Sequence, residues 1–361
     1  MTERSRTNVP KSEGSQTRSA AGAGMAARPV PGHAEGAALA LPWLVADIGG
    51  TNARFGWVAE VASGVQHVAT LGVAEHAGPA QAAHAYLSGL RERLGAAWSA
   101  PRKAAIAVAT AVDGDRVDLT NSPWSFSRAA LAQALQLDAL LVLNDFEALA
   151  LSLPRLGPAQ LRAQGALPSP RGTLAVIGPG TGLGVAGVVQ TAQGWIALPG
   201  EGGHATLAAA DEFESRLIDL VRRDHAHVSA ERLLSGIGLP VLHEAVARLN
   251  GGAVETLAAQ AIVERGLAGD AGCARTLDHF CALLGGFAGN VALTLGARGG
   301  VYIGGGIVPR LGERFFASRF RERFEAKGRF RAYLQAIPTA LVTDTLAALS
   351  GAALAIEQHA R

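Results

Sequence analysis

The sequence predicts an α/β fold with a mixed β-sheet, and three observations support this prediction. Segments with strand patterns and segments with helical spacing alternate along the first half of the chain. Hydrophobic residues make up 49% of the 361 residues and charged residues only 17%, so the chain can form a large core. Apolar strands followed by glycine-rich turns occur as VADIGGTN, AVIGPGTGLG and VYIGGGI. This composition excludes a globally disordered chain.

The first half of the chain alternates strands and helices. Strand patterns cover residues 41–60 (two strands around the turn GGTN), 64–73, 103–110, 116–126 and 139–145. Helical spacing covers 79–97, and Ser127 can cap a second helix. The last strand leads into a third helix that ends at Pro154. Ligands on such sheets bind outside the carboxyl ends of strands, and Asp47, Asn144 and Asp145 lie near such ends.

The second half begins with strands and continues mainly with helices. Strand patterns cover 173–190 (two strands around a glycine loop), 194–207, 299–311 and 332–344. Helical patterns cover 211–226, 229–235, 239–249, 253–268, 271–297 and 345–358. The glycines of the helix at 271–297 allow close helix packing. The second half is therefore also expected to be α/β.

The glycine loops are candidate phosphate sites. Backbone N–H groups in a tight glycine turn form a nest that binds anions, although an ordinary hairpin turn is the better interpretation of any one loop alone. Three such turns can meet one nucleotide only if two domains face each other. A Walker A motif is absent, because none of the three lysines follows such a glycine. The G-x-G-x-x-G spacing at 182–187 continues into strand-like sequence, so we interpret it as a coincidence.

Charge, cysteine content and hydropathy exclude other classes of protein. A net charge of +2 without a basic run argues against nucleic-acid binding. Cys273 and Cys281 fit neither a disulfide framework nor a zinc site, so we expect buried core residues in a reducing compartment. Because no apolar stretch reaches 18 residues, we expect no membrane span and a cytoplasmic protein. Residues 1–40 are expected to be a disordered tail, with translation starting at Met1 or Met25.

Seven segments form a recognisable series along the chain. They are LVADIGGTNARF (44–55), TNSPWSF (120–126), LNDFEALA (143–150), IGPGTGLGVA (177–186), LPGEGGHATLA (198–208), SAERLLSGIGL (229–239) and GGVYIGGGIVPR (299–310). In this order they resemble the bacterial glucokinase family of the hexokinase–actin–Hsp70 superfamily. The resemblance implies a two-domain ribonuclease-H-like (actin-like ATPase) fold with the active site in the interdomain cleft. A small α/β domain would comprise 41–155 plus 344–361, and a large α/β domain 156–343.

The resemblance also implies roles for individual residues. Asp145 would be the general base that takes the proton of the sugar 6-hydroxyl as that oxygen attacks the γ-phosphate. Judged without the resemblance, Asp145 could simply be a helix N-cap. The sugar-binding residues implied are Asn121, Asn144, Glu201, His204 and Glu231. Taken alone, Glu231 would fit an acidic residue at a helix start, and His204 a metal ligand or a surface turn, although no second His lies at ligand spacing.

A second group would bind the nucleotide and its phosphates. Its members are Asp47, Gly49, Gly50, Thr51, Asn52, Gly180, Thr181, Gly182, Gly304, Gly305 and Gly306. Asp47 would orient water on Mg²⁺ rather than bind the ion directly, because Mg²⁺ keeps several waters. No other metal ligand is expected. Arg54 is either a charge partner of phosphate or a strand-surface residue, and the second interpretation is the better one.

The activity implied by the resemblance is that of an ATP:D-glucose 6-phosphotransferase acting with ATP and Mg²⁺. A kinase for another hexose, or one that uses polyphosphate, is the enzymatic alternative. The non-enzymatic alternative is a sugar-sensing regulator, which is disfavoured because residues 1–40 are too polar and too rich in Gly and Pro to form a helix-turn-helix. The resemblance further implies a homodimer, with glucose and ATP as the partners and no nucleic acid or membrane.

Overall fold

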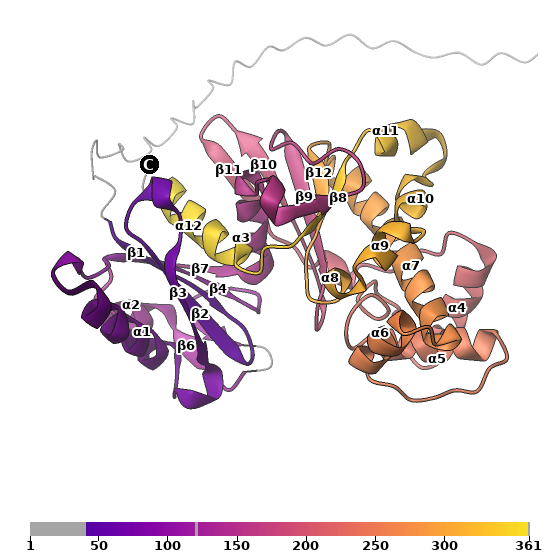
Figure 1. The fold of residues 1–361 in the computed structure, drawn as a ribbon, viewed down its shortest axis with the longest axis horizontal. Coiled ribbons are helices and arrows are strands. Elements are labelled where there is room, and N and C mark those ends of the chain that lie inside the picture. The colour runs from indigo at the N-terminus through magenta and orange to yellow at the C-terminus, as the bar shows by residue number, and fades with distance from the viewer. Residues whose placement is uncertain (1–40, 120–121, 360–361) are drawn as a thin grey trace, which may run out of the picture. The chain divides into compact units, whose positions relative to one another are not determined.

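The computed structural model describes residues 41–119 and 122–359 (Figure 1). The tail expected at residues 1–40 lies outside the described residues, and so does Asn121, one of the predicted sugar-binding residues. The described chain contains a five-stranded sheet, a six-stranded sheet and a two-stranded ribbon, with helices on their faces. The α/β class predicted from the sequence is therefore confirmed.

The five-stranded sheet has the order β3-β2-β1-β4-β7. Its strands are β1 (Trp43–Ile48), β2 (Asn52–Val58), β3 (Gln66–Gly72), β4 (Lys103–Val108) and β7 (Ala139–Asn144). β1, β4 and β7 are parallel, and Ile48, Val108 and Asn144 share one register position at their carboxyl ends. Side chains alternate between the faces of a sheet, so Leu44 packs into one core and Val45 into another.

Three helices pack against this sheet. They are α1 (Pro79–Leu94), α2 (Arg128–Ala134) and α12 (Ala347–His359). Residues of α1 pack with Leu44, whereas residues of α12 pack with Val45. Ser127 caps α2, as predicted, by accepting a hydrogen bond from the Ala130 N–H at 3.1 Å. The ribbon of β5 (Arg116–Asp118) and β6 (Ser125–Ser127) precedes α2.

The six-stranded sheet has the order β11-β10-β9-β12-β13-β8. Its strands are β8 (Leu161–Ala163), β9 (Thr173–Pro179), β10 (Leu183–Thr191), β11 (Gly194–Leu198), β12 (Gly300–Ile303) and β13 (Thr339–Val342). The G-x-G-x-x-G spacing lies at the start of β10, which turns into β11 and not into a helix. Its interpretation as a coincidence is therefore confirmed.

Helix α3 (Asp145–Ser152) lies beside α12 (Figure 1), and both contribute to one core with the six-stranded sheet. The two helices approach closely at Gly351, where a Cβ would lie 1.6 Å from the carbonyl oxygen of Ala148. Only glycine permits this distance. Because α3 follows β7 without a loop, this packing also determines where the first residue of α3 lies.

The remaining helices form a core on the other face of the six-stranded sheet. They are α4 (Glu212–Arg222), α5 (Leu239–Leu249), α6 (Ala259–Leu267), α7 (Ala271–Leu295), α8 (Val308–Leu311), α9 (Glu313–Ala317), α10 (Phe320–Glu325) and α11 (Arg331–Gln335). Cys273 and Cys281 of α7 are free thiols in this core, as predicted. In the described ranges no helix is long and apolar enough to cross a bilayer.

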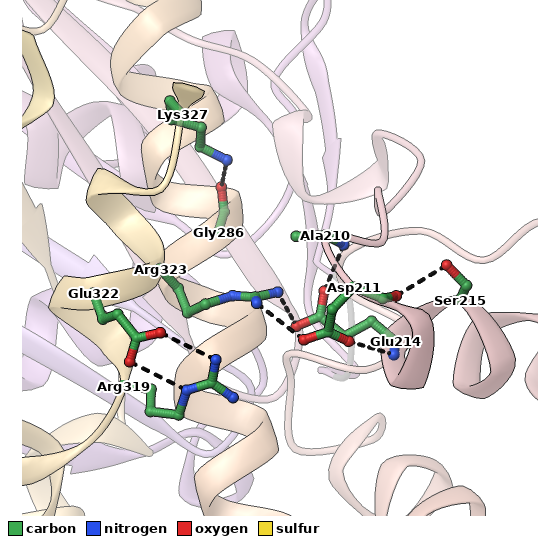
Figure 2. Close-up of polar contacts among 9 residues, drawn as sticks. All are labelled: Ala210, Asp211, Glu214, Ser215, Gly286, Arg319, Glu322, Arg323 and Lys327. Atoms are coloured by element: carbon green, nitrogen blue, oxygen red, sulfur yellow. Dashed lines mark hydrogen bonds and ion pairs between the residues drawn. The ribbon is translucent and has the colours of Figure 1, made fainter. Parts of the chain in front are cut away.

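A buried ionic cluster joins the start of α4 to α10 (Figure 2). The guanidinium of Arg323 pairs with the carboxylate of Glu214, and both side chains are buried. Arg323 Nη1 also lies 3.0 Å from Asp211 Oδ2. Asp211 in turn caps α4 by accepting the Glu214 N–H at 2.9 Å. Nearby, Lys327 Nζ donates to the carbonyl oxygen of Gly286 at 2.7 Å. The cluster therefore connects two helices far apart in sequence.

Some predicted elements differ from the structure. The segment 229–235, predicted to be helical, starts with a β-bridge between Ser229 and Thr206 and continues in bends and turns. Its backbone is held from outside the segment, because the N–H groups of Ala230 and Glu231 donate to the carbonyl oxygens of Ala205 and Gly203. The helix expected over 253–268 begins only at Ala259. The short strand β8 has no counterpart among the predicted elements, since its three residues carry no clear pattern.

Candidate active site

Asp145 is the first residue of α3 and directly follows β7. The N-cap of this helix is Asn144, whose Oδ1 accepts the N–H groups of Phe146 at 2.9 Å and Glu147 at 3.3 Å. The alternative in which Asp145 itself caps the helix is therefore wrong. Asp145 Oδ1 accepts the Phe146 N–H at 2.9 Å, which orients the carboxylate at the helix start. Asn144 Nδ2 donates to the carbonyl oxygen of Thr110.

The surroundings of Asp145 make it a weak acid for an aspartate. Burial, and secondly the negative charge of Asp47, raise the pKa of Asp145 to about 6, while the Phe146 N–H opposes this rise. A carboxyl with this pKa is largely ionised at neutral pH and still accepts a proton readily. A half-buried carboxylate whose pKa is raised by a second carboxylate is the arrangement expected of a functional acid or base.

Asp47 lies on β1 near the carboxyl end of the sheet. Burial raises the pKa of Asp47, and the positive charge of Arg54 counteracts this effect. Arg54 stands directly opposite Asp47 in the register of β1 and β2, with Nη1 3.2 Å from Oδ2. Arg54 therefore differs from its interpretation as a plain strand-surface residue, because it compensates the charge of a predicted site residue.

The structure brings Glu201, His204 and Glu231 together. His204 Nδ1 lies 3.5 Å from Glu201 Oε2, and His204 Nε2 lies 3.6 Å from Glu231 Oε1. Glu201 and His204 are mostly exposed, whereas only 21% of the Glu231 side chain is exposed. His204 and Glu231 also line a cavity of about 440 Å³, within the range of about 300–1,000 Å³ for small-molecule sites. Polar side chains grouped in this way can bind several hydroxyl groups at once.

Glu231 is also hydrogen-bonded to the second glycine loop. Its Oε2 accepts the Leu183 N–H at 2.8 Å, and a Cβ on Gly182 would lie 2.5 Å from the same oxygen. Glycine at 182 therefore makes room for the carboxylate. The loop is held from a further side by Gly236, whose N–H donates to the carbonyl oxygen of Gly180 at 2.7 Å. Thr181 lies at the tip of this loop.

The third glycine loop lies against the second. The Gly304 N–H donates to the carbonyl oxygen of Ile177 at 2.8 Å, and the Ile307 N–H to that of Pro179 at 3.1 Å. Gly305 has a φ of +76°, and a Cβ there would lie 2.3 Å from the Pro179 oxygen. This backbone conformation and this contact both require glycine. The loops at 179–183 and 304–307 therefore lie against each other, and Gly306 belongs to the second of them.

The first glycine loop connects β1 and β2 and comprises Gly49, Gly50, Thr51 and Asn52. The Gly49 N–H donates to the carbonyl oxygen of Asn52 at 2.9 Å, and the carbonyl oxygen of Thr51 accepts the Val73 N–H. The loop is thus an ordered turn beside Asp47, which lies on the preceding strand. The loop follows the carboxyl end of β1 and Asp145 follows the carboxyl end of β7, and both ends lie at the same edge of one sheet.

The carboxylate of Asp47 suits a magnesium ion that is shared with phosphates. Among the described residues, no group of three or more His, Cys, Asp or Glu side chains could hold a metal ion by itself. Asp47, near the carboxyl end of β1, supplies a carboxylate that can orient water on Mg²⁺, an ion that keeps several waters and is commonly held through one or two carboxylates plus substrate phosphates. The donor set therefore fits Mg²⁺ bound together with a nucleotide and does not fit a protein-only metal cage.

Sequence reasoning missed two contributors to this region. Phe146 follows Asp145, and its ring lies against Gly178 and Gly184 of the second glycine hairpin. The pairing of Arg54 with Asp47 is the other. Gly178 and Gly184, placed symmetrically before and after the loop, are a sequence signal that could have revealed the contact with Phe146. The pairing of Arg54 depends on the β1–β2 register, which could have been counted outward from the GGTN turn.

Comparison with known proteins identifies the family. The family model described as Glucokinase matches residues 44–359. The chain is 50% identical over 313 residues to the glucokinase of Paramagnetospirillum magneticum, covering 86% of this chain and 96% of that protein. A glucokinase structure from an Antarctic psychrotroph is 38% identical with a TM-score of 0.80, covering 88% of this chain and 98% of that one. The same fold occurs in a ROK family glucokinase from Streptomyces griseus, solved in complex with glucose and AMPPNP. That structure matches with a TM-score of 0.54 and 19% identity, covering 86% of this chain and 98% of that one. This chain belongs to the glucokinase family.

Proposed function

We propose that this protein transfers the γ-phosphoryl group of Mg-ATP to the 6-hydroxyl of D-glucose. The observation that carries the proposal is the placement of Asp145 at the start of α3, half-buried, where burial and the charge of Asp47 raise its pKa to about 6. A base with this pKa suits the deprotonation of an alcohol that becomes a nucleophile at neutral pH. Membership of the glucokinase family supports glucose as the sugar.

The reaction forms one bond and breaks one. The glucose 6-oxygen attacks the γ-phosphorus, and the bond from that phosphorus to the oxygen bridging the β- and γ-phosphates breaks, releasing ADP. The proton of the 6-hydroxyl passes to Asp145. Because the transition state of phosphoryl transfer is loose, positioning and charge neutralisation contribute most of the rate. Proton acceptance by a positioned base contributes about 10²–10⁴-fold.

Glu201, His204 and Glu231 would bind the sugar. The two carboxylates approach the His204 ring to within 3.6 Å, and His204 and Glu231 line a cavity of suitable size. Carboxylates accept hydrogen bonds from hydroxyl groups, and a buried acceptor left unpaired costs about 1–3 kcal/mol. This cost supports selection of a hexose over smaller alcohols and water. Asn144, which caps α3, would contribute to sugar binding if its amide exchanged a present hydrogen-bond partner for a sugar hydroxyl. Asn121 is proposed as a sugar-binding residue from the sequence alone.

The nucleotide would lie on the glycine loops. The adjoining loops at 179–183 and 304–307 offer a backbone surface free of side chains at Gly180, Gly182, Gly304, Gly305 and Gly306. Thr181, Thr51 and Asn52 supply side-chain donors near phosphates, with Gly49 and Gly50 allowing the turn. Asp47 would hold Mg²⁺ through water, and the bound ion would neutralise charge that develops on the phosphates. The AMPPNP complex of the Streptomyces protein supports an ATP-type nucleotide.

We further propose the domain division 41–155 plus 344–361 and 156–343, with the active site in a cleft between these domains. The sheets support this division, since the strands of one lie before residue 145 and those of the other between 161 and 342. Closure around the sugar would exclude water and prevent wasteful ATP hydrolysis. A homodimer in the cytoplasm completes the proposal; the free thiols of Cys273 and Cys281 fit a reducing compartment.

The test is a coupled assay on purified protein with a panel of hexoses and phosphoryl donors. Glucose with Mg-ATP should give the highest kcat/KM, and Asp145→Asn should reduce kcat by about 10²–10⁴-fold while leaving the glucose Kd within a few-fold. A higher kcat/KM with another hexose or with polyphosphate would instead assign the protein as a kinase for that sugar or that donor. Glucose binding without turnover by any donor would favour the regulator.

A further inference from the structure

The ring of Phe146 lies on a pair of glycines that face each other across two strands. Gly178 of β9 and Gly184 of β10 are register partners in the antiparallel pair that carries the second glycine loop. A Cβ on Gly178 would lie 2.4 Å from Phe146 Cζ, and a Cβ on Gly184 would lie 2.0 Å from Phe146 Cε2. Real Cβ atoms do not approach a ring this closely, so the ring occupies the space that both side chains would fill.

The same residue is attached to Asp145 on its other side. The Phe146 N–H donates to Asp145 Oδ1 and to Asn144 Oδ1, both at 2.9 Å. Its ring therefore contacts the base of the 179–183 hairpin, while its backbone N–H orients the carboxylate. Residues 178 and 184 flank Gly180, Thr181 and Gly182 at the tip of that hairpin.

We propose that Phe146 is a positioning residue that sets the place of the Asp145 carboxylate relative to the phosphate-binding hairpin. The catalytic part of this inference, that Phe146 affects turnover, rests on the proposed function. The ring packs against both glycines, so it fixes the distance between the start of α3 and the strands β9 and β10. Displacements of about 1 Å between reacting groups can cost about 10²-fold in rate. Phe146 would therefore influence turnover without contacting either substrate.

A second consequence concerns the water around Asp145. Burial is the largest cause of the raised pKa of Asp145, and we expect the neighbouring ring of Phe146 to limit the water that enters from the hairpin side. The charged group that acts on Asp145 is Asp47 of β1, which raises the pKa of Asp145, and Arg54 of β2 pairs with Asp47. Both belong to the five-stranded sheet and not to the hairpin. Truncation of Phe146 should therefore change the hydration of Asp145 and leave these charges in place.

The first experiment compares Phe146→Ala and Phe146→Leu with Phe316→Ala. Phe316 is also a half-buried phenylalanine, but it packs against the helical core away from the site. Phe146→Ala should lower kcat by about 10²-fold, with the glucose Kd within about threefold of the wild-type value. Phe146→Leu should restore most of the loss. Phe316→Ala should change only thermal stability.

The second measurement does not require turnover. Titration of the Asp145 carboxyl by ¹³C NMR should show a lower pKa in Phe146→Ala than in the wild-type protein, because water enters beside the carboxylate. Phe316→Ala should titrate like the wild-type protein. If the wild-type protein fails to phosphorylate any sugar, the proposed function is wrong, and this titration still decides the role of Phe146.

A double-mutant cycle with Gly184→Ala tests the contact itself, since the three atoms nearest to the added methyl all belong to Phe146. Gly184→Ala should reduce stability, and adding Phe146→Ala should recover part of the loss through a favourable coupling. Gly89→Ala, where nothing lies within 4 Å of the added methyl, should add independently. An unchanged Asp145 titration together with zero coupling would overturn the proposal.

Discussion

Arg54 stands directly opposite Asp47 on the neighbouring strand, and its Nη1 lies 3.2 Å from Asp47 Oδ2. The pair places one positive charge beside Asp47, whose own negative charge raises the pKa of Asp145. Arg54 therefore favours the ionised form of Asp47 against the burial that raises its pKa. The charge balance at the carboxyl edge of the five-stranded sheet depends on this cross-strand contact.

Arg54→Gln should weaken the use of Mg-ATP. Without the guanidinium the pKa of Asp47 rises further, which favours the uncharged form of Asp47, and we expect kcat/KM for ATP to fall about tenfold. The loss should be greater at pH 6 than at pH 8.5, because a raised pKa favours the protonated form of Asp47 more at the lower pH. Steady-state kinetics at both pH values measure this. Arg102→Gln, which removes an exposed pair with Asp138, should have no such effect, and equal losses in the two variants would contradict the prediction.

Glu231→Gln should impair sugar binding more than ATP binding. The amide keeps the shape of the side chain but removes the charge that faces His204 Nε2 and accepts the Leu183 N–H. Hydrogen bonds to charged groups contribute about 1.5–3 kcal/mol, so we expect the glucose Kd to rise about 10–100-fold. Isothermal titration calorimetry measures it directly. Glu244→Gln, in an exposed pair on α5, serves as the control, and a glucose Kd unchanged in Glu231→Gln would remove Glu231 from the sugar site.

Asp145→Asn should stabilise the folded protein at alkaline pH. The folded pKa of about 6 exceeds the ordinary value of 3.8, so ionisation of this carboxyl opposes folding. The cost begins near the unfolded pKa, grows as pH rises towards the folded pKa and is complete above it. The free energy of unfolding should therefore increase by about 2 kcal/mol at pH 8 and by less than half of that at pH 4.5.

Urea unfolding at the two pH values measures this gain. Asp219→Asn, at an exposed position on α4, should change the unfolding free energy by less than about 0.5 kcal/mol at either pH. A gain in Asp145→Asn that does not vary with pH would show that burial does not raise the pKa of Asp145.

Arg323→Met should destabilise the protein strongly, because it leaves Glu214 buried without its partner (Figure 2). Breaking a buried ion pair from one side costs about 3–5 kcal/mol, and burial already raises the pKa of Glu214. The double variant Arg323→Met/Glu214→Leu should recover most of the loss. Arg319→Gln removes the neighbouring exposed pair with Glu322 of α10, and this variant should cost less than about 1 kcal/mol.

Chemical denaturation of these variants separates buried charge from surface charge. If Arg323→Met and Arg319→Gln lose equal stability, the cluster between α4 and α10 contributes no more than a surface pair. The prediction concerns the free energy of unfolding, since none of these residues is among the predicted site residues.

Much of the fold follows from local patterns in the sequence. The strands β1, β4, β7 and β9 are apolar runs of residues adjacent in the chain, and glycine turns or polar residues mark where they end. The sequence predicts Asp145 at the end of such a run because a carboxylate there interrupts an apolar pattern. The helix predicted at 229–235 is wrong, because the segment starts with a β-bridge between Ser229 and Thr206 and continues in bends and turns.

The contacts among the site residues depend on folding of the whole chain. Arg54 meets Asp47 through the register of two strands, Glu231 reaches Leu183 across 48 residues, and Phe146 rests on Gly178 and Gly184. Hydrophobic spacing and turn chemistry act between neighbours in the chain, so they can be recognised in the sequence. Which distant side chains meet is settled by packing and strand register, because these bring together residues whose separation in the chain carries no local pattern.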